Sequence, residues 1–188
     1  MATSENRRIT GILLLVTGAL GLLASVTLTI DKIKILQDPN FKPSCSIDPT
    51  ISCGSVMNSW QGSLFGFPNP LIGIAAFSVV IVAGVLTLGG VALPRWFWSG
   101  LALGSAAGIA LIVFLIYSSL FEIHALCLWC MLVWSIMPIV LATSVAAALG
   151  AKATQQVRQV LAAVVLLWYI VVIGLIAVQF WDYWSSKF

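Results

Sequence analysis

The chain has 188 residues, of which 61% are hydrophobic and only 8% charged, and its formal net charge is +3. A soluble domain carries about 25% charged residues, so this composition excludes a soluble globular protein and predicts an integral membrane protein in a lipid bilayer. The few positive residues are scattered along the sequence, which excludes the basic surface that nucleic-acid binding requires.

The first predicted element is the uncharged run from Ile9 to Ile30, whose 22 residues are enough to cross the hydrocarbon core. Arg7 and Arg8 precede this run, an arrangement that a signal peptide shares. The apolar region of a signal peptide is only about 7–15 residues long, so we expect a retained transmembrane helix here.

A polar loop, residues 31–68, follows the first helix and carries apolar residues of its own. Within it, the stretch "DPTISCGSVMNSW" predicts a short helix that begins near Pro49. Val56 and Trp60 are four residues apart, so they would share one apolar face of that helix. We therefore expect the loop to form a cap, with a half-helix lying on the mouth of the helix bundle.

Four more uncharged runs are long enough to cross a membrane, and Asn69-Pro70 is a typical helix start. Backbone groups in lipid must be hydrogen-bonded internally, so these runs must be helical. We predict an all-α integral membrane protein in which residues 1–188 form a single membrane domain. Its expected transmembrane helices cover about 9–30, 69–94, 96–121, 123–151 and 159–181.

The distribution of lysine and arginine predicts the orientation, because positive residues are more frequent on the cytoplasmic side. If the N-terminus is cytoplasmic, that side holds Arg7, Arg8, Arg95, Lys152 and Arg158, and the opposite side holds Lys32, Lys34, Lys42 and Lys187. Three of the last four lie in the 31–68 loop, where Asp31, Asp38 and Asp48 accompany them. We expect a cytoplasmic N-terminus, which places every cysteine on the extracytoplasmic side.

Two of the four cysteines, Cys127 and Cys130, form the motif "CLWC" at the expected start of a helix. Residues three apart share a helix face, and the free N–H groups of the first turn favour a thiolate. A redox pair is therefore predicted, with a zinc half-site and a structural pair as alternatives. Cys45 and Cys53 are separated by seven residues, which fits a second zinc half-site poorly.

Two dithiols on one side of a membrane can pass a disulfide between them by thiol–disulfide exchange. Disulfides persist outside the cytoplasm, where the loop pair could be reached by a soluble protein. The helix pair could be reached from the lipid. These positions predict a relay between a protein thiol and an electron acceptor dissolved in the membrane. We expect no metal site.

The order of these motifs resembles the bacterial form of the vitamin K epoxide reductase family. The resemblance rests on Cys45, Cys53, the stretch "FPNP" in which Asn69 opens a helix, and CLWC at the head of a later helix, and it covers roughly residues 10–150. The chain ends seven residues after the fifth run. It therefore resembles a stand-alone member without a fused thioredoxin-like domain, in a bacterial cell membrane.

The resemblance implies a four-helix transmembrane bundle around a quinone, a capping half-helix in the first extracytoplasmic loop, and a fifth transmembrane helix. Bacterial members of this family oxidise an extracytoplasmic thioredoxin-like protein, here expected to be separate, and so support disulfide bond formation. The electrons pass to a quinone, either menaquinone or ubiquinone, which is the second substrate.

The resemblance also implies residue roles. Cys45 and Cys53 would be the shuttle pair, and Cys127 and Cys130 the active-site pair. Cys53 would exchange with Cys127, and Cys130 would face the quinone.

Three further residues would contact the quinone by the same resemblance. Asn69 matches a hydrogen-bond donor, and Ser59 matches a serine of the family motif. Trp134 stands where the human-type enzyme has a tyrosine.

Several alternatives stay open at this point. Asn69 can be a helix cap only, Ser59 can cap or turn the chain, and His124 can either tune Cys127 or simply lie at the interface. For the whole chain, one alternative is a non-enzymatic membrane protein with structural disulfides or a metal site. Another is the unrelated four-helix disulfide oxidase of proteobacteria, in which the CxxC motif lies near the first helices.

Overall fold

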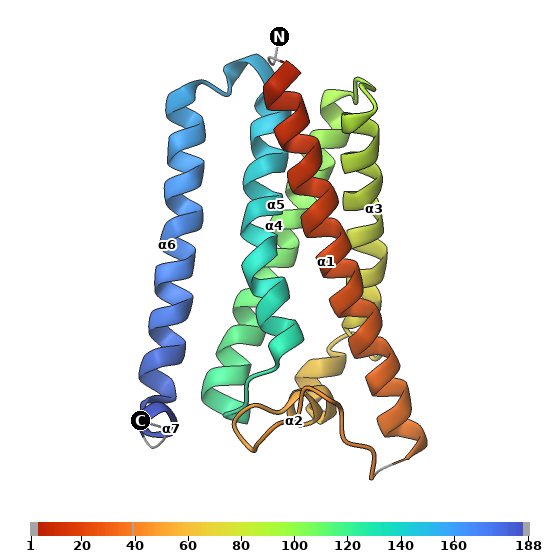
Figure 1. Ribbon diagram of the computed structural model, residues 1–188, viewed down its shortest axis with the longest axis vertical. Helices are drawn as coiled ribbons and strands as arrows, with labels where there is room; N and C mark the ends of the chain where they lie inside the picture. Colours follow the sequence, from red (N-terminus) through yellow and green to blue (C-terminus); the bar gives the residue numbers. More distant parts are fainter. Residues whose placement is uncertain (1–3, 39, 186–188) are drawn as a thin grey trace.

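The computed structural model describes residues 4–38 and 40–185 and is built from helices (Figure 1). Five helices within the described residues are long and apolar enough to span a membrane. They are α1 (Ser4–Gln37), α3 (Pro70–Leu88), α4 (Arg95–Tyr117), α5 (Leu128–Leu149) and α6 (Gln155–Gln179). The predicted all-α, multi-pass membrane fold is confirmed.

Four of these helices form a bundle, in which α1 packs against α3 and α5, and α4 packs against α5. The helix α6 lies outside the bundle and contacts α5 (Figure 1). Leu14, Phe77, Trp98 and Val140 are buried where the four helices meet. Large apolar side chains on the outer faces, such as Leu103 and Val178, are exposed and suit contact with lipid tails.

The helix α1 extends beyond the range expected from the uncharged run, at both ends. Its last turns carry Asp31, which is buried, and Lys32, whose Nζ donates a hydrogen bond to the backbone O of Met57 at 2.7 Å. The cap therefore provides a hydrogen-bond partner for Lys32, so this charged residue is accommodated in α1 beyond Ile30, where the uncharged run ends.

The cap lies across one end of the bundle and contains α2 (Cys53–Asn58) and the 3₁₀ helix η1 (Trp60–Ser63) (Figure 1). The expected start near Pro49 is wrong. The Oδ1 atom of Asp48 accepts hydrogen bonds from the backbone N–H groups of Thr50 and Ile51, which forms a turn there. Ser52 caps α2 instead, because its Oγ accepts from the backbone N–H of Ser55 at 3.2 Å.

The expected apolar face of Val56 and Trp60 is also wrong, because α2 ends at Asn58. Trp60 belongs to η1, is 64% exposed, and has its ring centroid 6.1 Å from that of Phe114. The buried residues of α2 are Cys53 and Met57, which belong to one cluster with Leu28 of α1.

The chain does not pass directly from α4 to α5. A π-helical turn, η2 (Ser118–Ile123), continues α4, and His124 follows in the left-handed region with φ 54°. The helix α5 begins only at Leu128, later than the expected residue 123. The intervening segment is not helical because its backbone pairs with the cap.

The N-terminal end of α1 lies at the same end of the molecule as the α3–α4 turn and η3 (Gly150–Lys152) (Figure 1). The cap, the start of α5 and the C-terminal helix α7 (Trp181–Ser185) lie at the opposite end. Lys187, used above in the orientation argument, lies outside the described residues.

Candidate functional site

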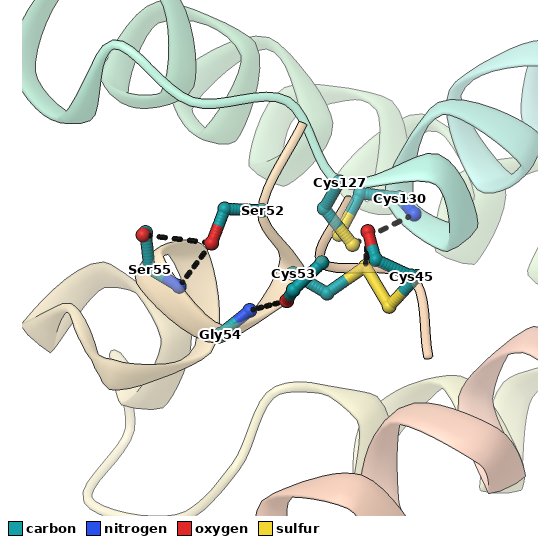
Figure 2. The surroundings of a disulfide bond; sticks show 8 residues. Cys45, Ser52, Cys53, Gly54, Ser55, Cys127 and Cys130 are labelled. Carbon is teal, nitrogen blue, oxygen red and sulfur yellow. Dashed lines mark hydrogen bonds between the residues drawn. A yellow bond between two sulfur atoms is a disulfide. The ribbon is translucent and has the colours of Figure 1, made fainter. Parts of the chain in front are cut away.

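Two segments far apart in the sequence pair as extended backbone at the site. Ile51 and Leu126 form an isolated parallel bridge. The backbone N–H of Leu126 donates to Thr50 O at 2.7 Å, and that of Ser52 donates to Leu126 O at 2.9 Å. Because the segments run parallel and a cysteine follows each one, this pairing brings the loop cysteines beside those of α5 (Figure 2).

Cys45 and Cys53 form a disulfide bond, with 5.7 Å between their Cα atoms. The two residues are 5% and 0% exposed, respectively. They form one buried cluster with Cys127, and the partly buried Cys130 packs against this cluster. All four cysteines therefore lie together at one end of the bundle (Figure 2).

Cys127 and Cys130 are free thiols at the first turn of α5. Cys127 is the N-cap residue, and its Sγ accepts a hydrogen bond from the backbone N–H of Cys130 at 3.4 Å. The pKa of Cys127 is lowered, first by hydrogen bonding from the Cys130 thiol, then by backbone N–H groups, and burial opposes this shift. Cys127 is therefore prepared to act as a thiolate.

A cavity of about 170 Å³ lies inside the bundle beneath the cap, and its walls are almost entirely apolar. Cys130 lines this cavity and Cys127 does not. An apolar cavity of about 150 Å³ can hold a benzene ring. This cavity is therefore large enough for an aromatic or quinonoid ring next to the Cys130 thiol.

A scan against protein-family models matches the Vitamin K epoxide reductase family (VKOR) over residues 12–145. The chain belongs to the VKOR family. A search of curated proteins gave no match. As a member of this family, the chain is a membrane thiol–disulfide oxidoreductase. The VKOR family is linked to quinones in general.

Asn69 of this VKOR-family chain lines the cavity, but it makes no side-chain capping bond to α3. The reading of its side chain as a simple helix cap is therefore wrong. Its Nδ2 donates to the backbone O of Gln61 at 2.6 Å, and its Oδ1 accepts from the backbone N–H of Leu64 at 3.1 Å. These two bonds attach η1 to the start of α3, and one Nδ2 hydrogen is left for another acceptor.

Trp134 and Ser59, the other two residues that sequence reasoning selected, lie in different places. Trp134 is buried on α5, lines the cavity, and accepts at its backbone O a 3.0 Å hydrogen bond from Trp168 Nε1 of α6. Ser59 does not line the cavity, and its Oγ donates to the backbone O of Val56 at 2.7 Å. Ser59 therefore shapes the cap between α2 and η1.

Sequence reasoning missed three polar residues that line the cavity of this VKOR-family chain: the buried Ser25 of α1, and also Gln61 and Ser118. Gln61 and Ser118 are buried as well. Gln61 lies in η1, and its Nε2 donates to the Glu122 carboxylate in η2. No spacing in the sequence identifies Gln61 or Ser118, because the two short helical turns that hold them are produced by tertiary packing. Among the described residues, no group of three or more His, Cys, Asp or Glu could hold a metal ion.

Proposed function

We propose that this chain oxidises a thioredoxin-like extracytoplasmic protein, reduces menaquinone or ubiquinone, and so supports disulfide bond formation. One observation carries the proposal: Cys130 lines the ring-sized cavity, while Cys127 packs against the Cys45–Cys53 disulfide. Within the Cys127–Cys130 pair, Cys127 therefore lies next to the loop disulfide, and Cys130 lies next to the cavity that we assign to the quinone.

In the proposed cycle, a thiolate of the partner protein attacks the Cys45–Cys53 disulfide and forms a mixed disulfide. The second partner thiol displaces this bond, so the partner leaves oxidised and the loop pair becomes a dithiol. Cys53 then attacks Cys127 in the oxidised α5 pair, and Cys45 resolves the new bond. This exchange restores the loop disulfide and leaves Cys127 and Cys130 reduced, the state described above.

In the next step, the Cys130 thiol passes its proton to the neighbouring Cys127 thiolate, and the Cys130 thiolate so formed adds to a ring carbon of the quinone. Cys127 then gives this proton to the quinone oxygen and attacks Cys130 Sγ, the carbon–sulfur bond breaks, its electron pair returns to the ring, and the second oxygen takes a proton from water. A thiol and a thiolate have become one disulfide, and their two electrons, with one proton from the thiol and one from water, convert the quinone to a hydroquinone. Asn69 would stabilise the developing negative charge with its remaining Nδ2 hydrogen, and Trp134 would lie against the ring.

The burial of Cys45 and Cys53 requires the loop to open before a protein thiol can reach them. A groove on the loop, about 440 Å³ in volume, passes next to the disulfide at Ser46 and Gly54. We propose that the partner enters here. The proposed orientation places the N-terminus in the cytoplasm and this groove on the extracytoplasmic side of a bacterial cell membrane. A quinone contact by Ser59 stays a prediction, as does the single domain over residues 1–188.

Quinone reduction by the purified protein tests this function, with either dithiothreitol or a reduced thioredoxin-like protein as electron donor. Cys130→Ser should abolish the reaction with both donors, because it removes the sulfur next to the cavity. Cys45→Ser should impair the protein-coupled reaction more than the dithiothreitol reaction, since the small thiol can reduce the α5 pair directly. Full quinone reduction by Cys130→Ser would contradict the assignment.

A further inference from the structure

The cavity contains a buried hydrogen-bond acceptor that has no partner among the described residues. Gln61 is 4% exposed and lines the cavity, and its Oε1 is buried without a hydrogen bond. A buried carbonyl oxygen without a partner is costly, so such groups are normally satisfied by water or by a ligand. The position of this oxygen in a ligand-sized cavity indicates a ligand that donates a hydrogen bond.

Glu122 fixes which end of the Gln61 amide is available. A carboxylate only accepts hydrogen bonds, so the amide NH₂ group must point toward Glu122, as the Nε2–carboxylate bond requires. The Oε1 atom is then left for the cavity. Glu122 itself is exposed and does not line the cavity, so it acts on the ligand only through Gln61.

Ser118 provides a second unpartnered polar atom in the same cavity. It is 0% exposed, and its Oγ is buried without a hydrogen bond among the described residues. A hydroxyl can donate to a carbonyl oxygen or accept from a hydroxyl group. Ser118 can therefore bind either redox form of a quinone, whereas Gln61 Oε1 can only accept.

We propose that Gln61, oriented by Glu122, makes this cavity bind a hydroquinone more tightly than the corresponding quinone. This inference rests on the proposed function, because it assigns the cavity to the quinone. A quinone has only acceptor oxygens, which cannot bond to Oε1. A hydroquinone has two O–H donors, one of which satisfies it. Tighter binding of the reduced form raises the reduction potential of the bound quinone, which favours thiol oxidation.

Binding of menadione and of menadiol tests the proposal under anaerobic conditions. The full chain carrying Cys127→Ser and Cys130→Ser is the parent protein, since it has no free thiol to react with either probe. One hydrogen bond is worth about five- to tenfold in affinity, so menadiol should bind the parent more tightly by that factor. A tenfold preference corresponds to an upward shift of about 30 mV in the midpoint potential of the bound probe.

Gln61→Met keeps the approximate length of the side chain but removes its acceptor. In this variant the affinities for menadiol and menadione should become about equal. Glu122→Gln tests the orienting contact without changing the cavity wall. A neutral amide at 122 can accept or donate, so the Gln61 amide can rotate and the preference should fall several-fold.

Three control variants distinguish this effect from a general loss of structure. Ser118→Ala should weaken both probes alike, because a hydroxyl serves either form. Ser144→Ala changes a buried serine whose Oγ already donates to Val140 O at 2.7 Å, and it should change neither affinity. Glu5→Gln removes an exposed carboxylate from the opposite end of the bundle and should leave the preference intact.

The possible outcomes separate this inference from the proposed function. If the parent binds neither probe, the quinone assignment of the cavity fails, and this inference fails with it. If the parent binds both probes equally, or Gln61→Met and Glu122→Gln keep the full preference for menadiol, the quinone site stands and the role of Gln61 is overturned. An equal affinity of the parent for both forms is also the result expected if a water molecule satisfies Oε1 in either state.

Discussion

At the residue scale, the position of Cys127 at the junction of an extended segment and α5 controls its acidity. As the N-cap residue, it receives the backbone N–H of Cys130 and lies within hydrogen-bond reach of the Cys130 thiol. The thiol contributes more to the lowered pKa than the backbone does, and burial opposes both. Cys130 thus has two tasks, because it stabilises the Cys127 thiolate and also lines the cavity.

Replacing Cys130 tests this contribution. Cys130→Ala removes the donor, so Cys127 should ionise at a higher pH than in Cys130→Ser, whose hydroxyl can still donate to the thiolate. Either variant has one free thiol, because Cys45 and Cys53 are joined in a disulfide. The ultraviolet absorbance of the thiolate against pH therefore reports Cys127 alone. Identical midpoints in the two variants would show that the Cys130 side chain has no part in the shift.

Sequence reasoning found the CLWC pair by its local spacing at the head of an apolar run, and it placed Asn69 at a helix start because Pro70 comes next. The expected quinone contacts of Asn69, Ser59 and Trp134 came from the family resemblance. Gln61 and Ser118 could not be found from local spacing. The first reaches the cavity because η1 turns the chain back, and the second because α4 ends in a π-helical turn.

At the element scale, α6 and α7 attach the C-terminal part of the chain to the cap. The hydroxyl group of Tyr183 in α7 donates to Asp48 Oδ2 at 2.6 Å. The other oxygen of Asp48 holds the turn before Ser52 and Cys53. The fifth transmembrane helix showed no chemistry in its sequence, yet it brings a tyrosine to the loop that carries the disulfide.

Tyr183→Phe should loosen this loop, and hydrogen exchange at the amides of Thr50 and Ile51 should become faster. The pKa of Tyr183 is raised, chiefly by its bond to Asp48, so the hydroxyl remains a donor at neutral pH and loses its proton only above the ordinary value for tyrosine. In the wild type, ionisation of Tyr183 should therefore not accelerate hydrogen exchange at Thr50 and Ile51 until the pH exceeds the ordinary pKa of tyrosine.

Tyr169→Phe provides the matched control for this experiment. Tyr169 lies on the same connection, in α6, and its hydroxyl donates to Ser135 O at 2.6 Å, away from the cap. This variant should leave exchange at Thr50 and Ile51 unchanged. Equal acceleration in both tyrosine variants would mean that α6 acts on the bundle as a whole, and not through the Asp48 contact.

At the scale of the whole molecule, composition was sufficient to predict the membrane fold, because apolar runs long enough to span must be helices in lipid. It was not sufficient to predict the ends of those helices. The helix α1 continues through the charged Lys32 because the cap supplies a carbonyl group that accepts its hydrogen bond. The helix α5 begins after the expected residue 123 because the backbone of Leu126 pairs with the loop. Such long-range contacts have no local signature, and they are the contacts that bring the two cysteine pairs together.

The close approach of α1 and α3 holds the bundle, and with it the cavity, in shape. These two helices make the most extensive contact of any pair. A Cβ atom on Gly84 of α3 would lie only 2.7 Å from the backbone N of Leu15 in α1. Backbone atoms cannot move aside as a flexible side chain can, so Gly84→Ala must separate the helices. We expect a loss of about 1–3 kcal/mol in the free energy of unfolding.

Gly174→Ala makes the same chemical change in α6, where a new Cβ would meet nothing within 4 Å. Alanine is the better helix former by about 0.5–1 kcal/mol, so this variant should be slightly more stable than the wild type. Thermal unfolding in detergent measures the stability of both variants, and their midpoint temperatures should shift in opposite directions from that of the wild type. Because α1 and α3 both line the cavity, Gly84→Ala should also weaken menadione binding, whereas Gly174→Ala should not. If Gly84→Ala unfolds at or above the wild-type temperature, the close contact of α1 with α3 is not what holds the four helices together.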